Sequence, residues 1–160
     1  MGFYHTAQIC LNGHMINGEA DKYLEHNELF CSICGAKTVT SCLNCGMPIR
    51  GTHEEPGVLI IGDSASVRSY CHNCGKPYPW TVSAIEATML LIQEEEEFSE
   101  QLKNSLSDSL PDIISETPKT NLAITRIKKA LSFAGNFTAE GIRQFVIDFG
   151  CELAKQSLGL

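Results

Sequence analysis

Apolar residues are spaced differently in the two halves of this 160-residue chain, and the change falls near Tyr78-Pro79-Trp80. Before this point the apolar segments are short, alternate with polar residues or contain β-branched side chains, and are separated by turn signals. After it, apolar residues recur at intervals of three and four, which is the spacing of amphipathic helices. The pattern predicts an α+β protein, with a β-rich domain at residues 1–79 and an α-helical domain at residues 80–160.

Short strands are predicted in the N-terminal half, between turn signals such as Asn12-Gly13 and Asn17-Gly18. Together these segments contain too little apolar surface to form a stable core without a cross-link. The predicted strands run from Phe3 to Ile9, from Lys37 to Thr40, from Val58 to Ile61 and from Val67 to Tyr70.

The C-terminal half is predicted to begin with one long helix. A capping box at Ser83-Ala-Ile-Glu86, or Thr81 as an alternative cap, would start this helix. Apolar residues at helical spacing then continue as far as Leu106. The acidic run Glu94–Glu97 falls in the middle of the segment and is interpreted as a solvated face. Pro111 suits the first turn of a separate, short helix.

Two more helices are predicted after this short one. The second runs from Asn121 to Ala134, with Thr120 as its N-cap and Gly135 as its stop. The third begins at Thr138 and carries an amphipathic stripe, beside which Cys151 is interpreted as a small buried residue. The apolar faces are expected to bury one another in a small bundle. The stripe of the third helix consists of Ile142, Phe145, Val146, Phe149 and Leu153.

Six of the eight cysteines form three copies of the motif Cys-x-x-Cys-Gly, all in the N-terminal half. This turn points two thiolates at one ion, and its glycine takes a positive φ that lets backbone N–H groups face the sulfurs. A fourth pair, Cys10 and His14, flanks the Asn12-Gly13 turn. Eight soft ligands are enough for two tetrahedral Zn²⁺ sites. The expected ligands are Cys10, His14, Cys31, Cys34, Cys42, Cys45, Cys71 and Cys74.

His14 is assigned as a ligand because the three cysteine pairs leave two coordination positions to fill, and His5 and His26 are its alternatives. A redox role would suit a single Cys-x-x-Cys motif, but three copies without a βαβ pattern favour metal binding. Bound metal would supply the folding free energy that the small core lacks, about 10 kcal/mol or more for each structural site.

No catalytic motif accompanies these ligands. A catalytic zinc keeps one coordination position open, whereas eight ligands in four pairs close two sites. His53-Glu54-Glu55 lacks the second histidine that a metalloprotease motif requires. We therefore expect two structural zinc ions. The absence of a catalytic motif argues against an enzyme but leaves an enzymatic role open.

The second to fourth ligand pairs, with Phe30 before one knuckle and Tyr70 before another, resemble a double zinc ribbon. The resemblance covers residues 8–77 and implies sequential pairing, in which the first two pairs share one ion and the last two share the other. His14 and the insert Ile49–Ser69 depart from the ribbon pattern. A RING-like cross-brace, which would join the first pair to the third, is the alternative that the spacing leaves open.

The whole chain is also similar to an uncharacterised bacterial family, known as a domain of unknown function. Three segments carry this resemblance: the start Cys10–His14, the junction Lys76–Thr81 and the helical-tail segment Glu116–Thr120. The resemblance implies zinc ribbons followed by a helical tail, and it implies no activity.

The charge of the chain bears on its partners. The net charge of −7 argues against a general polyanion binder, and the cations near the knuckles are spread along the sequence. We expect an adaptor that acts through protein–protein contacts, with the helical domain as the contact surface. A nucleic-acid-binding ribbon and an enzymatic or effector site in the helical domain are the alternatives, and self-association through the helical domain stays open.

The composition fits a globular protein, with 43% hydrophobic and 19% charged residues. No apolar run reaches the roughly 18 to 20 residues that a membrane span needs. The first ten residues lack the basic start and apolar stretch of a secretory signal. We therefore expect a cytoplasmic protein without membrane contact, in a reducing compartment where clustered cysteines bind metal more often than they form disulfides.

Overall fold

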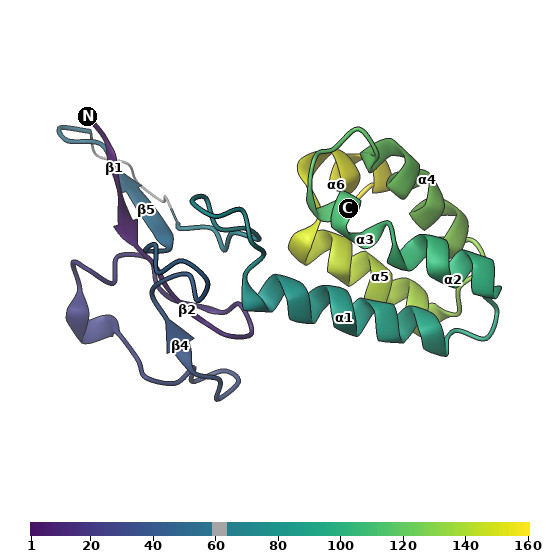
Figure 1. The fold of residues 1–160 in the computed structure, drawn as a ribbon, viewed down its shortest axis with the longest axis horizontal. Helices are drawn as coiled ribbons and strands as arrows, with labels where there is room; N and C mark the ends of the chain where they lie inside the picture. The colour runs from purple at the N-terminus through teal and green to yellow at the C-terminus, as the bar shows by residue number, and fades with distance from the viewer. Residues whose placement is uncertain (59–63) are drawn as a thin grey trace. The chain divides into compact units, whose positions relative to one another are not determined.

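A computed structural model describes residues 1–58 and 64–160 of the chain (Figure 1). The chain divides into two compact units, Met1–Val82 and Ser83–Leu160. Short strands lie in the first unit and helices fill the second, so the predicted α+β class is confirmed. Most of the strand predicted from Val58 to Ile61 lies outside the described residues. None of the described helices is long and apolar enough to cross a membrane.

The first unit contains two small antiparallel sheets. The predicted strand from Phe3 to Ile9 divides at Ala7, because its two halves pair with different partners. The first half is β1 (Phe3–Thr6), which pairs with β5 in a two-stranded sheet. The second half is β2 (Gln8–Cys10), which is the central strand of the three-stranded sheet β3-β2-β4. The sequence analysis missed β3 and β5, and Tyr70 forms only an isolated bridge with Pro77. The strands are β1 (Phe3–Thr6), β2 (Gln8–Cys10), β3 (Met15–Asn17), β4 (Thr38–Val39) and β5 (Arg50–Glu54), and a 3-10 turn, η1, spans Leu24–His26.

The aromatic pair Tyr78 and Trp80 forms much of the small core of the first unit. Trp80 is only 1% exposed, and its ring stacks on that of Tyr78 with 4.6 Å between the ring centroids. The indole N–H of Trp80 donates a hydrogen bond to the carbonyl oxygen of Arg68 at 2.8 Å. Both rings are therefore committed to the interior of the unit.

His5 ties β1 to two carboxylates within the first unit. Its Nε2 lies 2.8 Å from an oxygen of Glu54 and its Nδ1 lies 3.3 Å from an oxygen of Asp21. Burial disfavours the charged imidazole, but the hydrogen bonds that it donates to the carboxylates of Glu54 and Asp21 outweigh this effect, so the pKa of His5 is raised above its usual 6.5. Lys22 also pairs with Glu54, at 2.8 Å, and completes a local charge cluster.

The raised pKa of His5 predicts a pH-dependent difference between the wild type and His5→Asn. The stabilisation from His5 is fully present below the unfolded pKa and is lost as the pH rises through the folded pKa. The variant should therefore lose more stability at pH 6 than at pH 8.5, as measured by guanidinium unfolding at a fixed, saturating zinc concentration. Comparing the two proteins at each pH cancels the pH dependence of metal binding itself. An equal loss at both pH values would contradict a charged His5.

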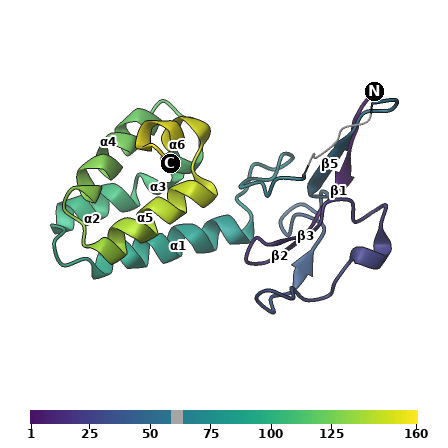
Figure 2. The ribbon, with the colours of Figure 1, turned by 180° about the vertical axis from the view of Figure 1, so that it is seen from behind.

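The second unit is built around α4, which contacts α2, α3, α5 and α6. Its core is aliphatic, with Leu106, Ile113, Ile127 and Ile142 fully buried. Figure 1 and Figure 2 show α5 running beside α1, and Leu91 of α1 approaches Gly141 of α5. The helices are α1 (Pro79–Glu94), α2 (Glu100–Ser107), α3 (Leu110–Ile114), α4 (Thr120–Leu131), α5 (Asn136–Phe149) and α6 (Glu152–Leu158).

Several predicted helix ends are wrong. The first helix begins at Pro79, before the proposed caps Thr81 and Ser83, and Thr81 instead hydrogen-bonds Ser69. Thr120 is the first residue of α4 rather than its N-cap, and its hydroxyl donates to the carbonyl oxygen of Ser115.

The predicted third helix is divided in two. It ends at Phe149, and Cys151 is the N-cap of α6 instead of a buried residue of one long helix. The N–H of Cys151 donates to the carbonyl oxygen of Ile113 at 2.8 Å, which fixes the break between α5 and α6. Pro111 does lie in the first turn of a short helix, α3, as predicted.

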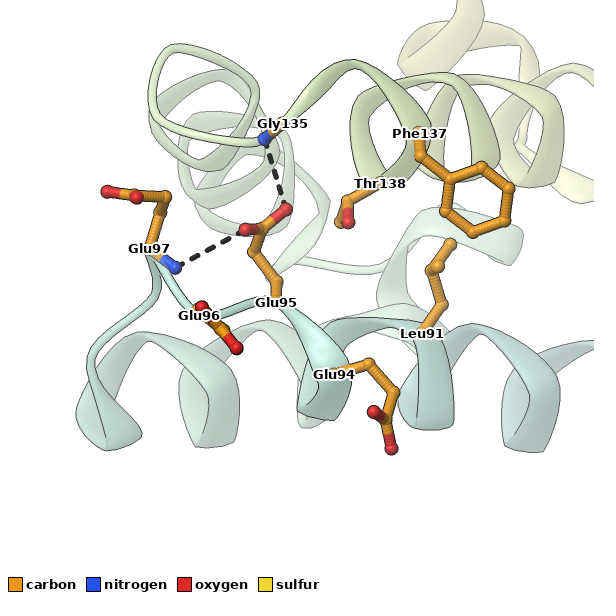
Figure 3. A pocket seen from close by; sticks show the side chains of 8 residues that line it. All are labelled: Leu91, Glu94, Glu95, Glu96, Glu97, Gly135, Phe137 and Thr138. Carbon is orange, nitrogen blue, oxygen red and sulfur yellow. Dashed lines mark hydrogen bonds between the residues drawn. The ribbon is translucent and has the colours of Figure 1, made fainter.

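The acidic run Glu94–Glu97 interrupts the predicted long helix, contrary to its interpretation as a solvated helical face. Glu95 is buried, and its carboxylate accepts the N–H of Gly135 at 3.0 Å and that of Glu97 at 3.3 Å (Figure 3). Gly135 is the N-cap of α5 and supplies no side chain, and the first turn of α5 contains no acidic residue. Glu95, in the turn directly after α1, thus provides the negative charge that a helix N-terminus favours.

Replacement of Glu95 by Ala should lower the melting temperature of the helical unit more than replacement of exposed Glu96 by Ala. The hydroxyl of Thr138 and the backbone N–H groups of Glu97 and Gly135 hold the pKa of Glu95 below its usual value. Its stabilisation is therefore present at neutral pH and lost as the pH falls through this lowered pKa. Circular dichroism melts of both variants at pH 7 measure the difference. Equal melting temperatures would rule out the capping role.

Candidate metal centres

Each Cys-x-x-Cys-Gly motif forms the predicted tight turn. The three glycines have positive φ angles: +71° at Gly35, +74° at Gly46 and +69° at Gly75. A Cβ atom at any of them would meet no atom within 4 Å, so the backbone conformation alone favours glycine at these positions. In the first knuckle the N–H of Gly35 donates to the carbonyl oxygen of Cys31 at 2.8 Å, and the other two knuckles repeat this bond. The motif therefore fixes the direction of both thiols locally.

The first group of ligands is Cys10, His14, Cys31 and Cys34. Their ligand atoms all lie within 4.8 Å of one another. The sulfurs of Cys10 and Cys34 are 3.7 Å apart, and Nδ1 of His14 lies 3.5 Å from the sulfur of Cys10 and 3.6 Å from that of Cys31. β2 positions Cys10 at its last residue, and the turn after it presents His14.

The second group is Cys42, Cys45, Cys71 and Cys74, again within 4.8 Å of one another. Two sulfur pairs span the knuckles, Cys42 to Cys74 at 3.8 Å and Cys45 to Cys71 at 3.7 Å. The structure thus groups the four pairs sequentially, as the resemblance to a double ribbon implies. The alternative cross-brace would have joined Cys10 to Cys42 and is not the arrangement formed.

These distances fit tetrahedral zinc. With Zn–S bonds of about 2.3 Å, two thiolates of a tetrahedron stand about 3.8 Å apart, and a histidine nitrogen stands about 3.6 Å from a sulfur. The sulfur–sulfur distances of 3.7 and 3.8 Å and the nitrogen–sulfur distances of 3.5 and 3.6 Å match these values. Both groups therefore have the spacing to hold a metal ion, and zinc suits the donor set.

The two alternative histidines lie in other surroundings. His5 is engaged by Asp21 and Glu54, and His26 stacks on Tyr23 with 5.8 Å between the ring centroids. The structure brings His14 to the cysteines and brings neither of the other two there. Its position follows from the Asn12-Gly13 turn, in which the N–H of Gly13 donates to the carbonyl oxygen of Cys10.

Each group contains a thiol that ionises readily. Backbone N–H donation from Ala36 lowers the pKa of Cys34 to about 6, and donation from Cys74 lowers that of Cys71 to about 6. Burial instead raises the pKa of Cys10, and it raises that of Cys42 to about 11. The thiolate is the form that binds metal, so Cys34 and Cys71 offer the first anionic ligand of each group at neutral pH.

Two asparagines support the sulfurs from outside the ligand set, and the sequence analysis missed them. The side-chain amide of Asn12 donates to the sulfur of Cys34 at 3.4 Å, and that of Asn73 donates to the sulfur of Cys45 at 3.6 Å. Such donors stabilise negative charge on a ligand and fix its orientation. The sequence contained a signal for this role, because an asparagine occurs within the Cys10–His14 turn and directly before the last cysteine of two knuckles.

Gly13 connects the first group to the core of the unit. It has a φ of +90°, and a Cβ atom there would lie 3.0 Å from Cβ of Trp80. The indole therefore packs directly against the turn that carries Cys10 and His14. This contact was not predicted, because it joins residues far apart in the sequence.

The comparisons with known proteins give one match. A family model described as "Uncharacterized protein conserved in bacteria (DUF2321)" matches residues 3–158. The search of curated proteins and the search of solved structures gave no match.

Proposed function

We propose that this chain, which belongs to the DUF2321 family of uncharacterised bacterial proteins, is a zinc-binding adaptor that acts through protein–protein contacts. In this proposal two zinc ions are structural cross-links of the first unit, and the helical unit carries the contact surface. The observation behind it is the pair of four-ligand groups, each with the spacing of a closed tetrahedral site.

A structural role for the zinc ions follows from the ligand count. Four protein ligands fill a tetrahedron and leave no position for a water molecule or a substrate. The ligands would be deprotonated cysteines and neutral His14, which requires a compartment that keeps thiols reduced. For this reason we place the protein in the cytoplasm.

Contacts with proteins, rather than catalysis, are supported by the surface of the helical unit. A hollow of about 490 Å³ in this unit is lined mainly by glutamates, Leu91 and Phe137. The buried carboxylate in this hollow, that of Glu95, is already bonded to the backbone and is poorly placed to act as a base. Exposed apolar side chains beside carboxylates are typical of a contact surface.

Affinity capture tests the adaptor role. The full chain should capture specific proteins from a bacterial lysate, and the variant Phe137→Glu should lose them while keeping its zinc content. The variant Glu116→Lys, changed on another exposed side chain, serves as the matched control. Capture that is equal for all three proteins, or absent for the wild type, would contradict the proposed contact surface.

Nucleic-acid binding by the first unit is the second candidate, because two arginines gather at one knuckle. Burial and the charges of Arg50 and Arg68 lower the pKa of His72, so both arginines lie close to this imidazole. The guanidinium of Arg50 lies 4.8 Å from the ring centroid of Tyr4, and both residues line a hollow of about 260 Å³ with His72. Cations beside an accessible aromatic ring suit a single-stranded nucleic acid.

Fluorescence anisotropy with mixed single-stranded DNA and RNA at low salt decides between the candidates. The adaptor proposal predicts no binding at micromolar protein concentration. Binding that weakens steeply with salt, and that Arg50→Glu abolishes while Lys119→Glu does not, would favour the second candidate.

A further inference from the structure

The hollow of about 260 Å³ in the first unit is built around the second group of ligands. Its lining comes from β1, with Tyr4, from the segment Met47–Arg50 and from His72. The segment directly follows the knuckle Cys42–Gly46, and His72 lies within the knuckle Cys71–Gly75. Sulfur pairs 3.7 and 3.8 Å apart join these two knuckles. The second group of ligands therefore holds the parts of the hollow together.

Two arginines give this hollow a positive charge. Arg50 lines it, and the charges of Arg50 and Arg68, after the larger effect of burial, lower the pKa of His72. Both arginine side chains are exposed, and neither forms an ion pair with a carboxylate of the described residues. Glu54, on the same strand as Arg50, pairs with Lys22 at 2.8 Å instead. Positive charge is thus left without a partner here, in a chain whose net charge is −7.

Much of the remaining lining is apolar and firmly held. Pro48 is exposed beside half-buried Met47, and Ile49 is buried. The N–H of Ile49 donates to the carbonyl oxygen of Thr40 at 2.9 Å, and its own carbonyl oxygen accepts the N–H of Ala7 at 2.8 Å. The hollow is smaller than the roughly 300 Å³ at which pockets for drug-sized ligands begin. It suits one or two side chains of a bound segment, with an anionic group next to an apolar one.

The aromatic ring at this hollow is partly occupied by its own neighbours. The guanidinium of Arg50 lies 4.8 Å from the ring centroid of Tyr4, and the ring of His53 meets that of Tyr4 edge to face at 4.8 Å. Stacking of a nucleobase requires a free ring face. Strong phosphate binding uses about six to ten contacts, far more than two arginines supply. These contacts favour a carboxylate ligand over a nucleic-acid strand.

We propose that this hollow binds an acidic segment of a partner protein. Carboxylates of the segment pair with Arg50 and Arg68, whose planar guanidinium groups match a carboxylate in two parallel hydrogen bonds. An apolar side chain next to these carboxylates packs on Pro48. The inference goes beyond the proposed function, which places one contact surface on the helical unit, and it gives the adaptor a second surface of different chemistry.

Selection from a random peptide library displayed on phage tests the chemistry of the segment. The baits are the full, zinc-loaded chain and its double variant Arg50→Gln/Arg68→Gln. The wild type should enrich peptides that carry acidic residues beside an apolar one, and the double variant should not. The matched control Lys37→Gln changes an exposed cation that follows a different knuckle, and it should enrich the same peptides as the wild type.

Fluorescence anisotropy of one selected peptide then measures the charge dependence. Replacing the carboxylates of the peptide by amides should weaken binding at least about tenfold, and the double arginine variant should weaken binding of the acidic peptide to the same degree. An unlabelled single-stranded oligonucleotide at micromolar concentration should not displace the peptide. Zinc content and the fluorescence of Trp80 check that the variants are folded.

No enrichment by the wild type, selected peptides without an excess of acidic residues, or equal binding of the acidic and amide peptides would overturn the inference. Displacement by the oligonucleotide would also overturn it and would favour nucleic-acid binding at this hollow. The adaptor proposal is judged separately, because its test changes Phe137 in the helical unit and leaves both arginines in place. The double arginine variant should still capture proteins through the helical unit.

Discussion

Chelation of the metal at neutral pH is expected to unfold the first unit, Met1–Val82, and to leave the helices of Ser83–Leu160 folded. The first unit has only short strands and a small core, and a structural zinc site contributes about 10 kcal/mol of folding free energy or more. Because whole domains are stable by only about 5 to 15 kcal/mol, loss of two such sites exceeds the stability that remains. The helical unit contains none of the eight ligands and has its own aliphatic core.

Trp80 provides the readout for this experiment, because it is the single tryptophan of the chain and is 1% exposed. Its fluorescence should shift to the red as a chelator is added, while most of the helical circular dichroism signal is retained. Restoring zinc should reverse the change, and magnesium at the same concentration should not. Unchanged fluorescence after complete metal removal would show that the first unit folds without metal.

Replacement of Trp80 by Ala should destabilise the first unit by about 3 to 5 kcal/mol, the range for loss of a buried aromatic side chain. The substitution leaves a cavity beside Tyr78, removes the packing against Gly13 and leaves the carbonyl oxygen of Arg68 without its indole donor. The metal affinity of the first group should fall as well, because Gly13 lies in the turn between Cys10 and His14.

Guanidinium unfolding followed by Tyr fluorescence or near-ultraviolet circular dichroism measures this loss at fixed zinc concentration. The variant Trp80→Phe is the matched control, since it keeps most of the apolar volume and loses only the indole N–H. It should be destabilised less than Trp80→Ala. Equal stability of Trp80→Ala and the wild type would contradict a structural role for this ring.

The candidate ligands could be predicted from the sequence because their geometry is local. A Cys-x-x-Cys-Gly turn directs both of its thiols by backbone hydrogen bonds between residues four or five apart, such as those that join Cys31 to Gly35 and to Ala36. The positive φ of Gly35 was predicted for the same reason. Which ligand pairs share an ion depends on contacts between residues that are distant in the sequence. The spacing of the ligands alone therefore left both the sequential pairing and the cross-brace open.

The helix boundaries were predicted less accurately than the candidate ligands, because they depend on contacts between residues that are distant in the sequence. The run Glu94–Glu97 has the composition of a solvated helical face, yet Glu95 is buried to cap α5 at Gly135, forty residues later. Helical periodicity on both sides of the run concealed this break. Likewise, β5 was missed because its partner, β1, lies far from it in the sequence.

Native mass spectrometry of the purified chain, checked by elemental analysis, tests the central claim most directly. The wild type should bind two zinc ions per chain, and the double variant Cys71→Ser/Cys74→Ser should bind one, because only the first group keeps four ligands. His14→Ala should lower the affinity of the remaining ion in that variant. A wild-type count near one or zero, or a double variant that still binds two ions, would contradict the two closed zinc sites proposed here.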